Sequence, residues 1–291
     1  ATEKRKADDA ELAAAAGDYR IDWHAQPRRP FKRGFIPYEA RDSAEEAAAA
    51  GRRKALGLSV ADPAGEEATP PPIEAFEGLG ALPPWLLEAL RDQGQYEPTP
   101  LQAQALPVSL AGQNLIGIAR QGAGQALAYL LPSAVHCADQ PALTDEEPGP
   151  IALILVPTQD HAAQVAAEAA KLLKLSGSLV GPRGTQGVRV VNVSGGGARS
   201  EKLKELTNKG ADIVIGTPKR VHDMASKEQM TLLRVTFLVL DGVDKMEELG
   251  FSREVEELAS WIRPERQTTM LTATWPKALS EMANVLCFAG G

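Results

Sequence analysis

The stretch Phe237-Leu238-Val239-Leu240-Asp241-Gly242-Val243-Asp244 decides the fold. Its first four residues are apolar, as in a buried strand, and acidic residues follow directly at the end of that strand. Many nucleotide hydrolases carry an Asp-Glu pair there, which holds magnesium and aligns a water molecule. Here the second position is Gly242, which has no carboxylate. The stretch therefore predicts a buried strand with an altered catalytic end.

Further apolar runs repeat this pattern along the chain. They cover residues 114–118, 151–156, 188–193, 212–216 and 268–272, and helical patterns cover residues 84–93, 124–138, 159–175, 199–208, 253–261 and 277–286. Continuous apolar strands that alternate with amphipathic helices predict an α/β domain, in which helices cover both faces of a parallel sheet. Ligands in such a sheet bind at the carboxyl ends of the strands.

A glycine-rich loop at residues 119–126 follows the first of these runs. Gly122 and Gly124 allow its backbone N–H groups to point at an anion, and the next helix adds its N-terminus. A phosphate loop ends in Gly-Lys-Thr, whereas this chain has Gly124-Gln125-Ala126. Gln125 is neutral and Ala126 has no metal-binding oxygen. The sequence predicts a phosphate pocket without its cation and without its magnesium ligand.

The composition changes at the proline run 70–72, which divides an extension (1–72) from a domain (73–291). The extension is rich in Ala, Pro and charged residues. It contains helical patterns at 8–16 and at 43–56, the second with a capping box that starts at Ser43. Between them, aromatic and basic residues gather from Trp23 to Phe35. We expect an extended, partly helical arm that binds a protein partner, and a disordered tail is the alternative.

Composition also excludes several classes of protein. The net charge of −7 argues against broad electrostatic adhesion to nucleic acid, although it leaves room for a local basic face. Cys137 and Cys287 lack a metal-ligand spacing and the four histidines are scattered, so no metal site is expected.

No apolar run reaches the roughly 20 residues of a membrane span. The chain has no signal-peptide pattern. It also has no initiating Met, so cleavage of an N-terminal targeting peptide stays an open alternative. We expect an intracellular protein, with organelle, nuclear and cytoplasmic ribonucleoprotein particles all left open.

Eight short motifs occur in a fixed order. They are Phe76-Glu77-Gly78-Leu79, Pro98-Thr99-Pro100-Leu101-Gln102, the loop 119–126, Pro157-Thr158-Gln159-Asp160, Gly195-Gly196-Gly197, Thr217-Pro218-Lys219-Arg220, Asp241-Gly242-Val243-Asp244 and Thr272-Ala273-Thr274-Trp275-Pro276. In this order they resemble the first RecA-like domain of DEAD-box RNA helicases, from about residue 76 to the C-terminus. A generic nucleotide-binding sheet would explain neither the second motif nor the last.

The resemblance implies a nucleotide pocket. Gln102 would read the adenine base and Phe76 would stack on it, while Gly122 and Gly124 would surround the phosphates. Asp241 would reach magnesium through water. ATP or ADP with magnesium is therefore the implied ligand, but the altered loop leads us to expect that no cofactor is required.

The resemblance also implies an RNA face at the other motifs. The residues that retain the groups for phosphate contacts are Thr158, Gly196, Thr217 and Arg220. Gln159 stands where the family has arginine and so removes a cation. Lys219 stands where the family has glycine, so it partly restores the charge but is expected to change the turn.

Because Gln125, Ala126 and Gly242 lack the groups for hydrolysis, we expect a chain that is not an enzyme. The given sequence ends one helix after residues 272–274, and from this we expect no second RecA-like domain. The first hypothesis is a structural scaffold in a larger, ribonucleoprotein-type assembly, whose protein subunits contact the N-terminal arm. Two alternatives stay open: a nucleotide-binding switch without hydrolysis, and an active RNA-dependent ATPase that works with a partner domain.

Overall fold

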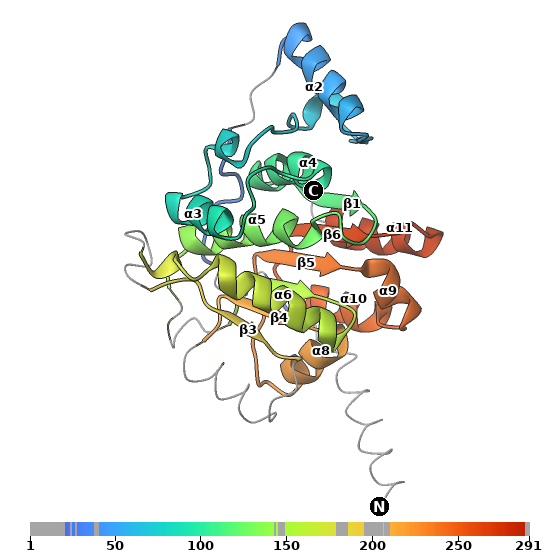
Figure 1. Ribbon diagram of the computed structural model, residues 1–291. Coiled ribbons are helices and arrows are strands. Elements are labelled where there is room, and N and C mark those ends of the chain that lie inside the picture. The colour runs from blue at the N-terminus through green and yellow to red at the C-terminus, as the bar shows by residue number, and fades with distance from the viewer. Residues whose placement is uncertain are drawn as a thin grey trace, which may run out of the picture.

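The structure is a computed structural model. It describes residues 21–23, 25–26, 28–37, 41–142, 144, 149–178, 186–194, 206 and 210–288. Its centre is a six-stranded sheet in the order β1-β6-β5-β2-β4-β3, and every neighbouring pair is parallel (Figure 1). The strands are β1 (Leu115–Ile118), β2 (Ala152–Leu155), β3 (Val190–Asn192), β4 (Ile213–Gly216), β5 (Phe237–Asp241) and β6 (Gln267–Thr272). The predicted parallel sheet is confirmed.

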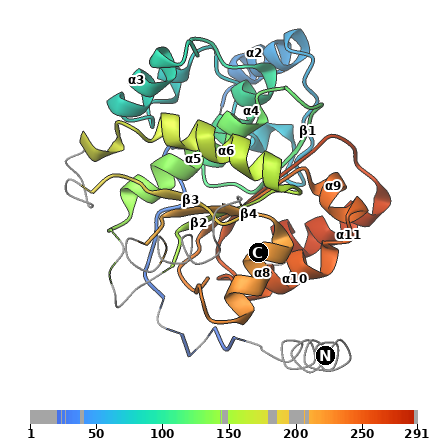
Figure 2. The ribbon, with the colours of Figure 1, turned by 60° about the horizontal axis from the view of Figure 1, so that its bottom comes forward.

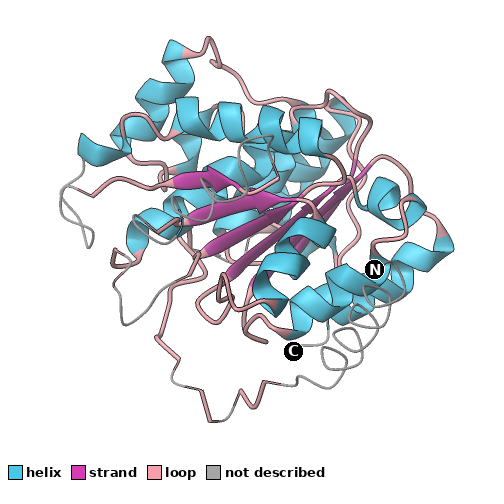
Figure 3. Cartoon of the chain, turned by 90° about the horizontal axis from the view of Figure 1, so that it is seen from below, coloured by secondary structure: helices cyan, strands magenta, loops and turns pink. Residues whose placement is uncertain are grey.

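Helices cover both faces of the sheet, as Figures 2 and 3 show. One face carries α3 (Pro84–Asp92), α4 (Pro100–Leu110), α5 (Gln125–Asp139) and α6 (Gln159–Leu172), and the other carries α8 (Pro218–Ser226), α9 (Val243–Glu248), α10 (Ser252–Ser260) and α11 (Lys277–Ala283). Short turns of helix are η1 (Glu66–Ala68), η2 (Phe76–Leu79), η3 (Ser176–Ser178) and the π-turn η4 (Asn284–Phe288).

Strand β5 shows why the sheet needs both layers. Phe237 and Val239 belong to the core beneath α3–α6, whereas Leu238 and Leu240 belong to the core beneath α8–α11. Successive side chains of a strand point to opposite faces, so an uninterrupted apolar strand has to be buried on both sides. All five residues of β5 are buried.

Several predicted boundaries change. The strand expected at 188–193 is reduced to β3, Val190–Asn192. Helices α4, α8 and α9 are additional to the prediction. The helix expected at 8–16 lies outside the described residues, as does the one expected at 199–208 apart from Leu206.

Residues 28–37, which we call the strap, lie against the domain of their own chain. The Phe35 N–H donates to the carbonyl of Leu110 at 2.6 Å, just before β1. The rings of Phe31 and Phe35 meet His136 of α5 edge-on, at centroid distances of 5.5 and 6.2 Å. Trp23, ahead of the strap, donates to the Ser260 carbonyl at 3.4 Å. The aromatic anchors predicted for a protein partner are thus used within the chain, and partner binding by the arm stays a prediction.

Helix α2 (Ser43–Ala55) follows the strap and confirms the helix expected at 43–56. Its N-cap is Asp42 rather than Ser43. The Asp42 carboxylate accepts from the N–H groups of Ala44 and Glu45 at 2.8 and 2.9 Å, and the Glu45 side chain accepts from the Asp42 N–H. The capping box is therefore real but begins one residue earlier.

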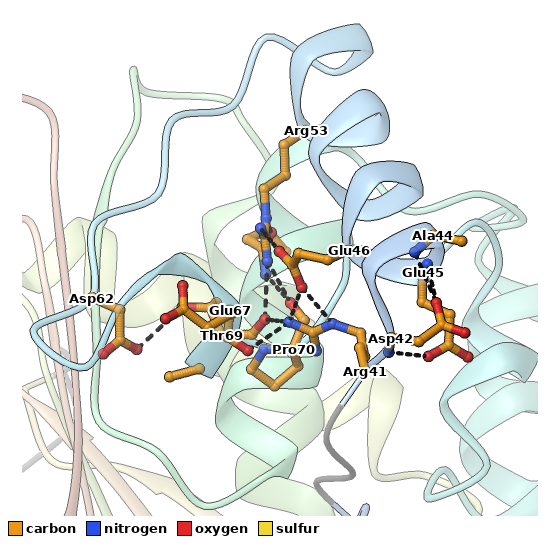
Figure 4. A network of polar contacts seen from close by, with 12 residues as sticks. Arg41, Asp42, Ala44, Glu45, Glu46, Arg53, Asp62, Glu67, Thr69 and Pro70 are labelled. Atoms are coloured by element: carbon orange, nitrogen blue, oxygen red, sulfur yellow. Dashed lines mark hydrogen bonds and ion pairs between the residues drawn. The ribbon is translucent and has the colours of Figure 1, made fainter.

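A buried arginine attaches α2 to the domain (Figure 4). Arg53 is 4 % exposed. Its guanidinium donates to the Gln104 side chain of α4 at 3.0 Å and to the carbonyls of Thr69 and Pro70 at 3.0 and 3.3 Å. Gln104 itself donates to the Pro70 carbonyl at 2.8 Å. Residues of the extension thus share one polar network with the domain.

We expect Arg53→Ala to lower the free energy of unfolding by roughly 2–4 kcal/mol, because it leaves the buried Gln104 side-chain oxygen without a donor and removes the hydrogen bonds to the Thr69 and Pro70 carbonyls. The matched control is Arg52→Ala. Arg52 pairs with Glu74, whose side chain is 80 % exposed, and such a pair contributes about 0–1 kcal/mol. Urea denaturation of both variants measures the difference. Equal losses would show that the Arg53 network does not stabilise the docked helix.

Candidate functional site

The carboxyl ends of the parallel strands form the edge at which ligands of such sheets bind. Figure 1 shows it as the edge toward which the strand arrows point. The glycine-rich loop follows β1, Gly242 follows β5, and Thr274 lies two residues beyond β6. The loops at residues 157–158 and at 217 follow β2 and β4. The five motifs that stand at the ends of these strands therefore meet at one edge.

Side chains of α4 and α5 hold the glycine-rich loop. The Thr99 hydroxyl donates to the Ala123 carbonyl at 2.8 Å, and the Gln102 amide donates to the Gly124 carbonyl at 3.0 Å. The Gln125 amide donates back to the Ala119 carbonyl at 3.0 Å and so closes the loop at its base. The role of Thr99 was not predicted, although its place as N-cap before Pro100 is a readable signal.

Glycines permit this loop. Gly122 and Gly124 have φ angles of +85° and +80°, a region that other residues rarely enter. A Cβ on Gly124 would lie 2.5 Å from the Gln102 side-chain nitrogen. Gly124 is also the N-cap of α5, whose first N–H groups have no partner within the helix. This loop and helix end suit a phosphate group.

The two residues predicted to recognise adenine are both buried. Gln102 is 1 % exposed, and its side-chain oxygen accepts from the Thr99 N–H at 3.0 Å. Phe76 is 2 % exposed and belongs to the core beneath α3–α6. In this structure Phe76 presents no ring face to solvent. Base recognition by these residues stays a prediction.

Asp241, at the end of β5, is 2 % exposed and has two side-chain partners. One of its carboxylate oxygens accepts from the Tyr129 hydroxyl at 2.8 Å and lies 3.2 Å from Nε2 of His161. Burial, and then the charge of Asp241, raises the pKa of Tyr129 well above its usual value, so the phenol remains a donor. Neither partner was predicted. His161 had a signal, since it directly follows the motif at 157–160.

Asp244 connects the loops that follow β5 and β6. Its carboxylate accepts from the backbone N–H and the hydroxyl of Thr274 at 3.0 and 2.9 Å. Burial alone would raise the pKa of Asp244, but the hydrogen bonds from Thr274 outweigh this effect and lower the pKa. The Thr272 hydroxyl accepts from the Asp244 N–H at 3.3 Å. An ionised Asp244 thus ties the two motifs together.

Gly242 adopts a backbone conformation that suits glycine. Its φ is +80°, and a Cβ there would lie 3.2–3.3 Å from the ring of Pro157. A side chain at this position would therefore require the backbone to change.

Some residues at the predicted RNA face are exposed, and others make hydrogen bonds within the protein. Thr158 and Gln159 are exposed, and the Thr158 hydroxyl accepts from the His161 N–H as the N-cap of α6. The Thr217 N–H donates to the Ser194 hydroxyl at 2.7 Å. Arg220 donates to the Val193 carbonyl at 3.1 Å. Gly196 lies outside the described residues.

The backbone of Lys219 does not need glycine. It lies in the first turn of α8, and it does not have a positive φ. The helix begins at Pro218, a residue that suits the first helical position.

No helix in the described part of the chain is long and apolar enough to cross a bilayer. Nor do three or more His, Cys, Asp or Glu side chains of the described residues converge as metal ligands would.

Comparison with known proteins places this geometry in a family. The DEAD/DEAH box helicase family model matches residues 99–282. The chain therefore belongs to this family, as its motif order suggested.

Relatives in plants cover the chain well. It is 37% identical over 282 residues to "DEAD-box ATP-dependent RNA helicase 20" of Oryza sativa subsp. japonica. This alignment covers 96% of this chain and 52% of the relative. It is 42% identical over 214 residues to "DEAD-box ATP-dependent RNA helicase 30" of Arabidopsis thaliana, spanning 74% of this chain and 34% of the relative. The chain thus spans about half or less of the length of these relatives.

Solved structures agree on the fold. The yeast DEAD-box splicing factor Prp28 superposes with a TM-score of 0.73 at 26% identity, covering 83% of this chain and 55% of the other. Prp28 from Chaetomium thermophilum bound to ADP gives a TM-score of 0.70 at 28% identity, covering 86% and 56%. The predicted RecA-like domain is confirmed.

The expectation that the chain is not an enzyme is wrong. Relatives at 36–42% identity are named ATP-dependent RNA helicases, and helicases are enzymes. The scaffold hypothesis finds no support in these comparisons, and neither does the expectation that no cofactor is required. The alternative of an RNA-dependent ATPase agrees with them better.

Proposed function

We propose that this chain is the first, ATP- and RNA-binding domain of an RNA-dependent ATPase of the DEAD-box type, completed by a second RecA-like domain. Its membership of the helicase family carries this proposal. The arrangement at the sheet edge supports it, because the loop that suits a phosphate follows β1 and the acid that suits magnesium ends β5 of the same sheet.

The proposed roles follow from the groups that the chain presents. The backbone N–H groups near Gly122 and Gly124 would bind phosphate, and Asp241 would hold magnesium through water. Bound magnesium supplies neutralisation of phosphate charge. Tyr129 and His161 both contact one oxygen of the Asp241 carboxylate and so hold it in place. Asp244 holds the loop after β6 at a fixed place beside it.

Part of the positive charge needed at the phosphates has to come from groups outside this domain. Gln125 is neutral and its amide is used within the loop. A second domain that brings an arginine to the phosphates would supply positive charge, and a single group of this kind is typically worth 10²–10³-fold in rate. A protein partner for the N-terminal extension and an intracellular ribonucleoprotein location remain part of the proposal.

The test is phosphate release from ATP by the purified chain, with a second RecA-like domain added and with or without single-stranded RNA. We expect turnover that RNA stimulates and that Asp241→Asn lowers by about 10²-fold or more, since a neutral amide cannot replace the carboxylate. Asp92→Asn, at an exposed acid that ends α3, is the control and should retain full activity. Equal turnover in the Asp241 variant, or no binding of either ATP or RNA, would contradict the proposal.

A further inference from the structure

Strands β2 and β4 bring two helix starts together. They are parallel neighbours, and Leu155 lies opposite Gly216 at their carboxyl ends. Helix α6 therefore begins beside α8, with Gln159 and Pro218 as their first residues. The N–H groups of both first turns lie along the edge where the motifs imply RNA phosphates.

Arg220 is the cation that the resemblance implies for this edge, but the structure turns it toward the protein. Its Nε donates to the Val193 carbonyl at 3.1 Å, and its guanidinium lies 3.6 Å from the Asp223 carboxylate. Only 18 % of its side chain is exposed. Nε and Nη1 of Arg220 are thus both engaged with the protein.

Lys219 is in the opposite situation. It is exposed in the first turn of α8, and its ammonium group makes no hydrogen bond or ion pair with another described residue. The acid one turn further along, Asp223, is paired with Lys227 and Arg220. Asp160, an exposed acid in the first turn of α6, makes no hydrogen bond or ion pair with Lys219.

The position of Lys219 is unfavourable for the fold. A cation in the first turn of a helix opposes the helix dipole. No acid among the described residues offsets this by pairing with it. A bound phosphate would offset it, because an anion is favoured at a helix N-terminus and pairs with the ammonium.

We propose that Lys219, and not Arg220, is the cation that contacts the phosphates of single-stranded RNA at the ends of β2 and β4. Arg220 then acts as a positioning residue that holds the start of α8 against Val193. The proposal rests on the proposed RNA-binding function. The contact is to the backbone, so it is independent of base sequence.

The experiment is binding of a fluorescent oligouridine RNA to the full chain over a range of KCl concentrations. One lost phosphate contact on a single strand reduces the slope of log K against log [salt] by about 0.7. We expect this reduction in Lys219→Ala, with several-fold weaker binding at low salt and a melting temperature that does not fall. Lys219→Arg should keep the slope. Lys227→Ala, at the other end of α8, is the matched control and should also keep it.

Arg220→Ala should lower the melting temperature and leave the salt slope unchanged. If Arg220→Ala does not fold, Arg220→Lys replaces it in the experiment. An unchanged slope in Lys219→Ala, or a reduced slope in the Arg220 variant alone, would overturn the assignment while RNA binding itself stands. If the unaltered protein binds no RNA at any salt concentration, the assignment and the proposed function are both overturned.

Discussion

Placing lysine and threonine at positions 125 and 126 is expected to raise the RNA-stimulated rate of ATP hydrolysis by about 10²-fold. The lysine would bring a cation to the loop between β1 and α5, and the threonine would bring an oxygen for magnesium. Neither replacement removes a buried contact beyond the hydrogen bond from Gln125 to the Ala119 carbonyl. Steady-state kcat and KM of the variant and the unaltered chain, each with the same second domain, give the result.

Gln125→Met is the matched control for this experiment. It also loses the hydrogen bond to Ala119, but it adds no charge. An equal rise in both variants would show that loosening the loop, and not the cation, limits the rate. Gly242 is left unchanged, because its φ of +80° and the nearby Pro157 ring would strain any side chain.

Local patterns were enough to predict the sheet. The alternation along β5 places successive residues in two cores, and only a strand covered on both faces suits that sequence. Helices α4 and α8 were missed because their sequences coincide with motifs. Both carry a readable start, Thr99-Pro100 and Thr217-Pro218, with a threonine N-cap and proline in the first turn. Helix α9 has only six residues, too few for a helical period to show.

The candidate site was predicted less well, because its contacts join distant parts of the chain. Tyr129 and Asp241 are separated by 112 positions, and no pattern in the sequence links them. The same holds for Thr99 and Ala123, which lie on different elements. The prediction about catalysis failed for another reason. It judged the whole protein from groups missing at three positions, whereas relatives at 36–42% identity are named as enzymes.

We expect the folded chain to lose stability in acid because of a buried histidine beneath the strap. His136 of α5 is 1 % exposed and lies among the rings of Phe31, Phe35 and Phe237. One ring nitrogen shares a hydrogen bond with the Thr236 hydroxyl at 2.7 Å. The other, Nδ1, is buried and has no partner among the described residues. A proton added to this ring would therefore place an uncompensated charge in the core.

Burial, with a smaller effect from the nearby charge of Arg33, lowers the pKa of His136 from 6.5 to about 3. The unfolded chain takes up a proton near pH 6.5, whereas the folded chain resists it until about pH 3. Stability from this group is thus fully present above pH 6.5 and is lost progressively as the pH falls toward 3. At about 1.4 kcal/mol per pH unit, the full loss is roughly 5 kcal/mol.

Urea denaturation between pH 7 and pH 4 tests this result through His136→Gln, whose amide can still bond the Thr236 hydroxyl but does not titrate. We expect the variant to be less stable than the unaltered chain at pH 7, because glutamine fills the space between the rings poorly. This difference should shrink as the pH falls, since only the unaltered chain loses stability through the histidine. Ser133→Ala, one helical turn earlier on α5, should instead give an offset that does not change with pH. A constant offset for both variants would mean that His136 is protonated in the folded chain as readily as in the unfolded one.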